Sequence, residues 1–373
     1  MNERAKELDS LRGIAVILVI AFHVFKRAAY FTKHEVLHFI SSLANIGWLG
    51  VDVFFVLSGF LITTILLKTK SGNNYFKFFY ARRILRIFPL YYVFIAVMLA
   101  LLPTLLPDYT PNIPVITPYL LLYIQNWIVR LGVVGLPAHL GATWSLAIEE
   151  QFYLIWPLVV YYFRREALIK IGLGAILFSF LYRLQAVLFW DASRQFAIFF
   201  YFDTFTRFSE LIFGALLAVF FMDPAWRERI RLFSLPIFIV SFLTFAGLCI
   251  YLFPNWIPYY SNAPFTVWAY ILIPLFSASL IGVLVTGSEN NLIRRVFRNK
   301  ILLFFGKYSY AMYLLHMPIA LTLLDFIDGT HRKGWKVYLA YIVLTFALTS
   351  LGSLVTWHVL EKHMLNLKKY FEY

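Results

Sequence analysis

A series of long apolar runs, spaced along nearly the whole chain, constrains the fold more than any other feature of this sequence. A membrane-crossing helix needs about 20 mainly apolar residues. Ten runs approach that length: 13–29, 46–67, 84–106, 145–163, 168–190, 207–222, 232–253, 264–286, 302–325 and 337–357. Charged residues make up only 14% of the chain, against about 25% in soluble domains. The sequence therefore predicts an all-α polytopic membrane protein with about ten transmembrane helices.

The remaining segments leave no room for a soluble domain, so we expect one membrane-embedded domain over residues 1–373. His23 interrupts the first run and Lys26 follows it, which favours a retained helix over a cleaved signal peptide. The run 118–131 is too short and polar to count. We expect a re-entrant or interfacial helix there, with an eleventh span as the alternative.

Lys and Arg are distributed unevenly between the predicted spans. With the N-terminus inside, the inner segments hold 23 of these residues and the outer segments 9. Positive residues favour the cytoplasmic side, so we expect both termini in the cytoplasm. The net charge of +14 lies between apolar runs and forms no basic stripe, which argues against a nucleic-acid partner. The single cysteine, Cys249, excludes a disulfide framework and a cysteine-rich metal site.

Several ionisable residues interrupt the apolar runs, where they are costly unless they face a cavity or a partner. They are His23, Glu149, Glu150, Arg183, Glu210 and His316. One interpretation is that each pairs with a neighbouring helix and only holds the bundle together. The other interpretation is functional and depends on how deep the side chains lie in the membrane. His23 lies about 16 Å beyond Arg12 along its helix, and Glu149 lies about 7 Å below Trp144. A histidine and a carboxylate at similar depth suit general-base chemistry on a hydroxyl.

Two further groups of charged residues each allow an ordinary structural interpretation and a functional one. Arg83 and Arg86 share a helix face at the inner end of a span, which suits either the ordinary topology signal or a phosphate site. Asp203, Arg207 and Glu210 lie at helical spacings, and we expect them to neutralise one another, with substrate binding as the alternative. We expect Arg183 in the same polar patch.

Six ordered blocks resemble the acyltransferase-3 family of integral membrane acyltransferases. They are LDSLRGIAVILVIAFH at 8–23, GVDVFFVLSGFLIT at 50–63, FYARRILRIFPLYY at 79–92, TWSLAIEEQFYLIWP at 143–157, GKYSYAMYLLHMP at 306–318 and HVLEK at 358–362. The resemblance covers nearly the whole chain. It implies an O-acyltransferase of the bacterial inner membrane that moves an acyl group, usually acetyl, from cytoplasmic acyl-CoA to a hydroxyl of an envelope glycan or other glycosylated acceptor. No metal is implied.

The resemblance also implies roles for particular residues. His23 matches the family's essential histidine and Glu149 the acidic residue, which makes them the expected catalytic pair. The expected acyl-CoA contacts are Arg12, Arg83 and Arg86, and the expected substrate contacts are Trp144, Ser145 and Tyr153. Some family members carry a fused extracytoplasmic SGNH-type hydrolase domain, and this chain resembles the stand-alone form.

Two rival functions fit the apolar pattern and the polar intramembrane residues. A transporter of a small polar or glycolipid substrate is one, although no paired halves with broken helices are evident. A structural or glycolipid-binding protein is the other, and it would not need His23. For an acyltransferase, the aromatic residues of the outer segments suit sugar rings, although aromatics also gather at membrane interfaces. They are Trp48, Tyr109, Tyr119, Trp127, Trp256, Tyr259, Tyr260 and Trp335.

Overall fold

The computed structural model describes residues 6–189, 200–252, 263–288 and 291–371, and within these ranges it contains helices and no strands. Nine helical segments of this described part are long and apolar enough to cross a membrane. The fold is therefore that of a multi-pass, all-helical membrane protein, as the apolar runs predict.

Each of the ten predicted spans falls on a helix, but one of them differs from the rest. The run 145–163 corresponds to α7 (Thr143–Tyr162), whose 20 residues reach about 30 Å but which is not among the nine. Glu149, Glu150 and Gln151 lie together in the first half of this helix and lower its mean hydropathy. In the described residues nine of the ten predicted spans are thus apolar enough by this measure, and α7 is a more polar helix of similar length.

The chain forms two compact units, each made of discontinuous segments. Unit 1 comprises residues 1–22, 42–68 and 152–307, and unit 2 comprises residues 23–41, 69–151 and 308–373. The division between the units falls within several helices, among them α1 (Lys6–Ala28), α7 and α14 (Lys300–Asp328).

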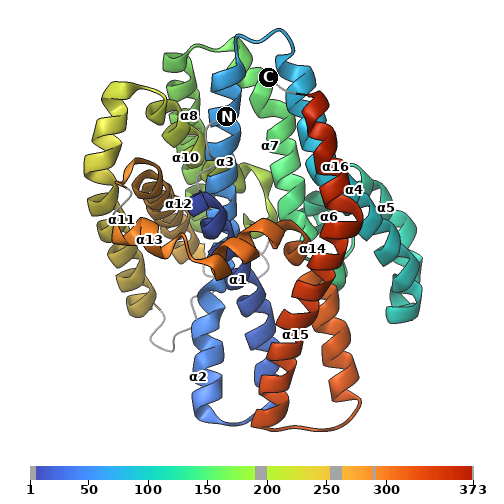
Figure 1. The fold of residues 1–373 in the computed structure, drawn as a ribbon. Coiled ribbons are helices and arrows are strands. Elements are labelled where there is room, and N and C mark those ends of the chain that lie inside the picture. The colour runs from blue at the N-terminus through green and yellow to red at the C-terminus, as the bar shows by residue number, and fades with distance from the viewer. Residues whose placement is uncertain (1–5, 190–199, 253–262, 289–290, 372–373) are drawn as a thin grey trace. The chain divides into compact units, whose positions relative to one another are not determined.

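Unit 1 contains the central part of the chain. Its other helices are α3 (Leu49–Thr69), α8 (Arg165–Phe189), α10 (Thr204–Phe221), α11 (Pro224–Leu252), α12 (Ala263–Thr286) and the short α13 (Leu292–Val296), with η2 (Asn45–Trp48) leading into α3. Helix α11 packs along α12, and α10 packs along both α8 and α12 (Figure 1). These contacts bury most of α10, and its apolar residues join those of α3 in the core of this unit.

Glycines allow α3 and α10 to approach each other at the backbone. A Cβ on Gly59 would overlap the carbonyl oxygen of Leu211, and a Cβ on Gly214 would overlap that of Val56. Small residues at such crossings favour close packing in membranes, where apolar side chains gain little by leaving lipid. The crossing fixes the register of two helices that also carry buried charges.

Unit 2 contains most of the remaining helices. They are α2 (Glu35–Ala44), α4 (Tyr75–Leu105), α5 (Ile113–Leu121), α6 (Gln125–Leu131), α15 (Trp335–Thr356) and α16 (Lys362–Asn366). Short 3-10 turns are η1 (Ala29–Phe31), η3 (Pro107–Asn112), η4 (Ala138–Leu140) and η6 (Leu367–Tyr370), and η5 (Trp357–Glu361) is a π-helical turn between α15 and α16.

The run 118–131 is a broken helix and not a span. Helices α5 and α6 are separated by Tyr123, whose φ of 54° is unusual for an aromatic residue. Its ring stacks on Tyr91 with centroids 4.1 Å apart, and the amide of Gln151 donates to its carbonyl at 2.9 Å. Burial, reinforced by nearby phenols and the carboxylate of Glu150, raises the pKa of Tyr123. The backbone of this break is thus held by side chains of α4 and α7, as irregular backbone in a membrane protein requires.

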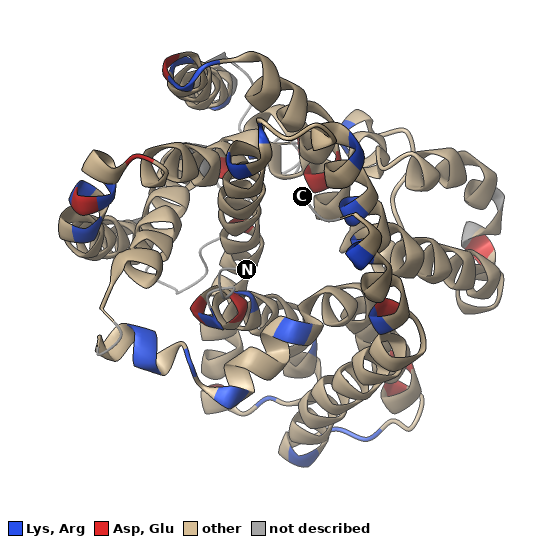
Figure 2. Cartoon of the chain, turned by 45° about the horizontal axis from the view of Figure 1, so that its top comes forward, with Lys and Arg blue, Asp and Glu red and all other residues tan. Residues whose placement is uncertain are grey.

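Lys, Arg, Asp and Glu residues are sparse on the helices and gather near helix ends and connections (Figure 2). In unit 1, Arg294 and Arg298 both contact the nearly buried carboxylate of Glu7, Arg294 Nη2 at 2.8 Å and Arg298 Nε at 2.7 Å. This triad ties the start of α1 to α13 and the residues that follow it. Some of the Lys and Arg residues on the predicted inner side, here Arg294 and Arg298, thus also form structural ion pairs.

Candidate active site

The two intramembrane histidines predicted from the sequence meet in unit 2. His23, on α1, is partly buried, whereas His316, on α14, is fully buried. His23 Nδ1 lies 3.2 Å from His316 Nε2, and the ring centroids are 5.1 Å apart. His316 Nδ1 in turn lies 2.7 Å from the carbonyl oxygen of Tyr313. The sequence interpretation gave His316 no role beyond packing, and the structure places it against the expected catalytic base.

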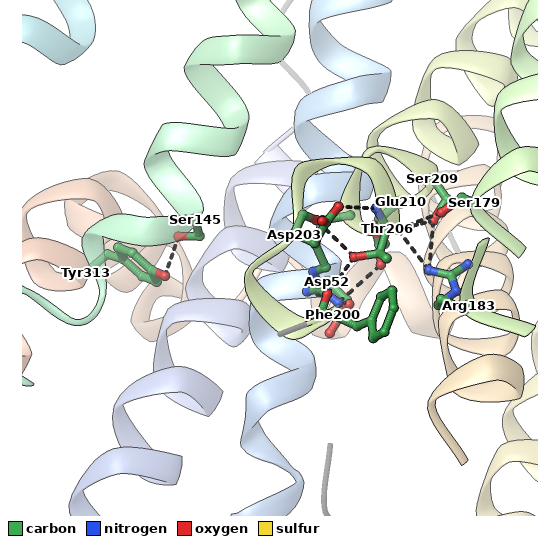
Figure 3. Close-up of polar contacts among 11 residues, drawn as sticks. Asp52, Ser145, Ser179, Arg183, Phe200, Asp203, Thr206, Ser209, Glu210 and Tyr313 are labelled. Atoms are coloured by element: carbon green, nitrogen blue, oxygen red, sulfur yellow. Dashed lines mark hydrogen bonds and ion pairs between the residues drawn. The ribbon is translucent and has the colours of Figure 1, made fainter. Parts of the chain in front are cut away.

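A second polar contact joins α14 to α7. The hydroxyls of Ser145 and Tyr313 lie 2.6 Å apart, and both side chains are buried (Figure 3). Trp144, beside Ser145, is also buried, with 5% exposed. Two of the three expected substrate contacts thus lie on the turn of α7 that is bonded to Tyr313, the residue whose carbonyl contacts His316.

Glu149 and Glu150 are both partly buried on α7. Glu150 interacts electrostatically with Glu149 and with Arg83 of α4. The helix turns these neighbours about 100° apart, so that only one of them can face a given partner. The pairing of Glu149 with His23 stays a prediction.

The expected acyl-CoA contacts are divided between the two units. Arg83 and Arg86 lie on α4 in unit 2, partly buried, and Arg86 has the buried carboxylate of Glu361 as an electrostatic partner. Arg12 lies on the part of α1 that belongs to unit 1, where its Nη1 is 2.7 Å from Asp9 Oδ1. The arginine pair of α4 is thus set among carboxylates, and a joint phosphate site with Arg12 remains a prediction.

Tyr153, the third expected substrate contact, belongs to unit 1 and is 5% exposed. Its ring packs edge-on against Phe152, with centroids 6.4 Å apart.

Of the outer aromatics, Trp48 is 1% exposed and packs against Tyr270, so it does not line an outer surface. Trp335 is 54% exposed. Trp256, Tyr259 and Tyr260 lie outside the described residues, as does the side chain of Tyr109.

Unit 1 contains a fully buried ion cluster that the sequence interpretation found only in part. Arg207 Nη2 lies 2.9 Å from Asp52 Oδ1, and Arg207 Nη1 lies 3.2 Å from Glu210 Oε1. Arg183 donates to the carbonyl of Thr206 at 2.8 Å (Figure 3). Both guanidinium groups lie over the ring of Tyr270, at 5.2 Å for Arg183 and 4.5 Å for Arg207.

This cluster agrees with the expected neutralisation of Arg207 by Glu210 and adds Asp52, which the sequence interpretation missed. The signal was present, because Asp52 is the single charged residue in the apolar part of the run 46–67. Asp203 differs from the expectation: its Oδ1 accepts from the backbone nitrogens of Phe205 and Thr206 and caps the N-terminus of α10.

Within the described residues, no group of three or more His, Cys, Asp or Glu side chains is arranged to hold a metal ion.

Comparison with known proteins identifies the chemistry of the chain's family. The model of a family described as "Acyltransferase domain" matches residues 5–357, which spans both units. No solved structure matches the chain significantly.

Three curated relatives share about the same region. The peptidoglycan O-acetyltransferase OatA of Listeria monocytogenes is 31% identical over 92% of this chain and 54% of its own length. The putative peptidoglycan O-acetyltransferase YrhL of Bacillus subtilis is 29% identical over 95% and 54%, and a putative O-acetyltransferase of Staphylococcus aureus (strain COL) is 28% identical over 91% and 54%. The chain spans about half the length of these relatives. The extent of the family match shows that this chain belongs to the acyltransferase-3 family of membrane acyltransferases.

Proposed function

We propose that this protein transfers an acyl group, most simply acetyl, from acyl-CoA to a hydroxyl group of an envelope glycan or another glycosylated acceptor. The protein is proposed to lie in the bacterial inner membrane with both termini in the cytoplasm, and the acyl-CoA to enter from the cytoplasmic side. The observation that carries this proposal is the contact of His23, a partly buried histidine inside an apolar helix, with the fully buried His316. An ionisable histidine inside a membrane span costs free energy that packing alone does not require. A second histidine that holds it in place is the arrangement expected of a general base.

In the proposed reaction, His23 accepts the proton of the acceptor hydroxyl as its oxygen attacks the thioester carbonyl carbon. The carbon–oxygen bond of the ester forms and the carbon–sulfur bond breaks. The departing thiolate takes the proton from the His23 imidazolium and leaves as CoA thiol. Glu149 stabilises the imidazolium while it exists, and the protein returns to its starting protonation state.

Arg83 and Arg86 are proposed to bind the phosphates of CoA, because guanidinium groups bind phosphate oxygens in bidentate fashion. Arg12 is proposed as a third contact, and Trp144, Ser145 and Tyr153 as contacts of the acceptor or the acyl chain. The names of the two relatives that act, or are thought to act, on peptidoglycan support an envelope glycan as the acceptor.

The test uses the full chain purified in detergent, with acetyl-CoA as the donor and chitotetraose as a model glycan. Appearance of CoA thiol is followed with a chromogenic disulfide, and the acetyl ester on the sugar is detected by mass spectrometry. We expect thiol release that requires His23 and increases with the glycan. Movement of unmodified substrate across proteoliposomes without thiol release would instead favour a transporter.

The acceptor class is tested separately in cells. The O-acetyl content of envelope polysaccharides and glycolipids is compared between cells with and without the protein. A lower content without the protein supports the glycan acceptor. An unchanged content, together with acetylation of a cytoplasmic small molecule by the purified protein, would contradict the acceptor and leave the acyl-CoA chemistry standing.

A further inference from the structure

Buried His316 forms two contacts whose donors and acceptors are determined by chemistry. Its Nδ1 lies 2.7 Å from the carbonyl oxygen of Tyr313, three residues earlier on α14. A carbonyl oxygen only accepts, so His316 Nδ1 carries a hydrogen and donates it. The side chain is 0% exposed, and burial disfavours the doubly protonated, charged ring. His316 Nε2 is therefore a lone-pair acceptor.

The tautomer of His316 determines that of His23. Because His316 Nε2 accepts, the atom 3.2 Å away, His23 Nδ1, must be the donor. A neutral imidazole carries one ring hydrogen, so a hydrogen on Nδ1 leaves the lone pair of His23 on Nε2. The chain of contacts Tyr313 carbonyl, His316 and His23 thus selects one of two tautomers of the expected base.

We infer that His316 is a positioning residue that holds His23 in its Nδ1–H tautomer, with Nε2 as the nitrogen that accepts the proton of the acceptor hydroxyl. This inference rests on the proposed function of His23 as the base. Orientation by a second group is what a basic histidine needs, because either the other tautomer or a rotated ring presents an N–H where the lone pair is required. Tyr313 contributes twice, through its carbonyl to His316 and through its hydroxyl to Ser145 of α7.

The kinetic test compares two substitutions at one position. Gln retains an acceptor oxygen near the position of Nε2, whereas Leu has a similar volume and no acceptor. We expect His316→Leu to lower kcat for acetyl transfer by about 100-fold or more with KM for acetyl-CoA changed by less than about threefold, since tautomer loss has large effects in other histidine bases. His316→Gln is expected to retain at least about a tenth of kcat.

The matched control is His358→Leu. His358 forms the same type of contact, Nδ1 to the carbonyl of Leu354 at 2.8 Å, but it is exposed. Its replacement is expected to change kcat by less than about twofold. Near-normal kcat in His316→Leu, in a protein whose His23→Ala variant is inactive, would overturn the positioning role while leaving the proposed function intact. Full activity of His23→Ala would instead contradict the proposed function.

A spectroscopic test needs neither turnover nor a folded Leu variant. Nitrogen NMR of wild-type protein labelled with 15N-histidine distinguishes Nδ1–H from Nε2–H rings, and the signal of His23 is assigned by its absence in His23→Gln. We expect the Nδ1–H tautomer for both His23 and His316. An Nε2–H signal for His23 would overturn the inference, whatever the activity of the variants.

Discussion

The buried ion cluster around Arg207 and the histidine pair His23–His316 are both polar sites inside apolar helices, yet they are built in opposite ways. In the cluster, Asp52 and Glu210 oppose Arg207 and Arg183, so two formal negative charges face two positive ones. The side chains of Asp52, Arg207 and Glu210 are 0% exposed. In the pair, two imidazoles contact each other, and His23 is only partly buried.

This difference separates polar residues that hold helices from polar residues that react. If one member of a fully buried ion pair changes its protonation, its partner becomes an uncompensated buried charge and the protein loses stability. Such a pair therefore suits a structural contact between helices. A neutral histidine that keeps some exposure and has an orienting neighbour can change its protonation at low cost. We therefore assign stability to the cluster of unit 1 and chemistry to the pair of unit 2, and each assignment leads to a different mutant phenotype.

The largest effect is expected at His23. His23→Ala removes the proposed base without opening a large cavity, and acetyl transfer should fall by about a thousandfold or more. The melting temperature of the detergent-solubilised variant should stay near that of the wild type. The control is His34→Ala, an exposed histidine beyond the end of α1. Substantial activity in His23→Ala would remove the contrast between the two sites.

The cluster is expected to show the reverse phenotype. Arg207→Met leaves Asp52 and Glu210 buried without their shared partner, which typically costs about 3–5 kcal/mol. We expect a strongly lowered melting temperature in size-exclusion thermostability measurements. Adding Asp52→Asn to Arg207→Met removes the excess negative charge, leaves Glu210 opposite the buried Arg183, and should recover much of the loss. If the double variant is no more stable than Arg207→Met, or if Arg207→Met is itself stable, the cluster does not hold the helices together.

A smaller loss is expected from the carboxylates of α7. Glu149→Gln should lower kcat by about 10- to 100-fold if Glu149 stabilises the imidazolium, since it keeps the shape and removes the charge. Glu150→Gln, its neighbour on another face of the helix, should lower kcat less. Equal effects of the two substitutions would mean that the sequence interpretation chose the wrong face of α7.

The arginine pair of α4 is expected to act on binding. Arg83→Ala or Arg86→Ala should weaken acetyl-CoA binding by about tenfold, measured by calorimetry, and Lys at either position should restore only part of it, because Lys lacks the bidentate fork. Arg82→Ala is a matched control, because Arg82 Nη1 donates to the carbonyl of Phe371. Unchanged affinity in the Arg83 and Arg86 variants would reduce the pair to its topological role.

The sequence predicted the helical fold well because hydropathy and helix length determine membrane spans almost directly. The least apolar of the predicted spans is α7, where three consecutive polar residues lower the mean hydropathy of a long helix. At the candidate sites the sequence singled out polar residues inside the spans but not the partners that the structure gives them. The pairing of Asp52 with Arg207 and of His23 with His316 joins residues 155 and 293 positions apart. Such pairings follow from helix packing, including the Gly59–Gly214 crossing, which no local pattern encodes.

The smallest effect tests whether Ser145 binds substrate or only holds α14 against α7. Its hydroxyl lies 2.6 Å from that of Tyr313, and both are buried. Removing one partner leaves a buried hydroxyl without this bond, at a cost of about 1–3 kcal/mol, whereas removing both can be nearly neutral. We therefore expect Ser145→Ala and Tyr313→Phe each to lower the melting temperature more than the double variant does. Enzyme kinetics then separate the roles: if Ser145 contacts substrate, Ser145→Ala raises KM even in the Tyr313→Phe background, where its structural bond is already lost. An unchanged KM in that background would assign Ser145 to the framework that carries Tyr313 and, through its carbonyl, His316.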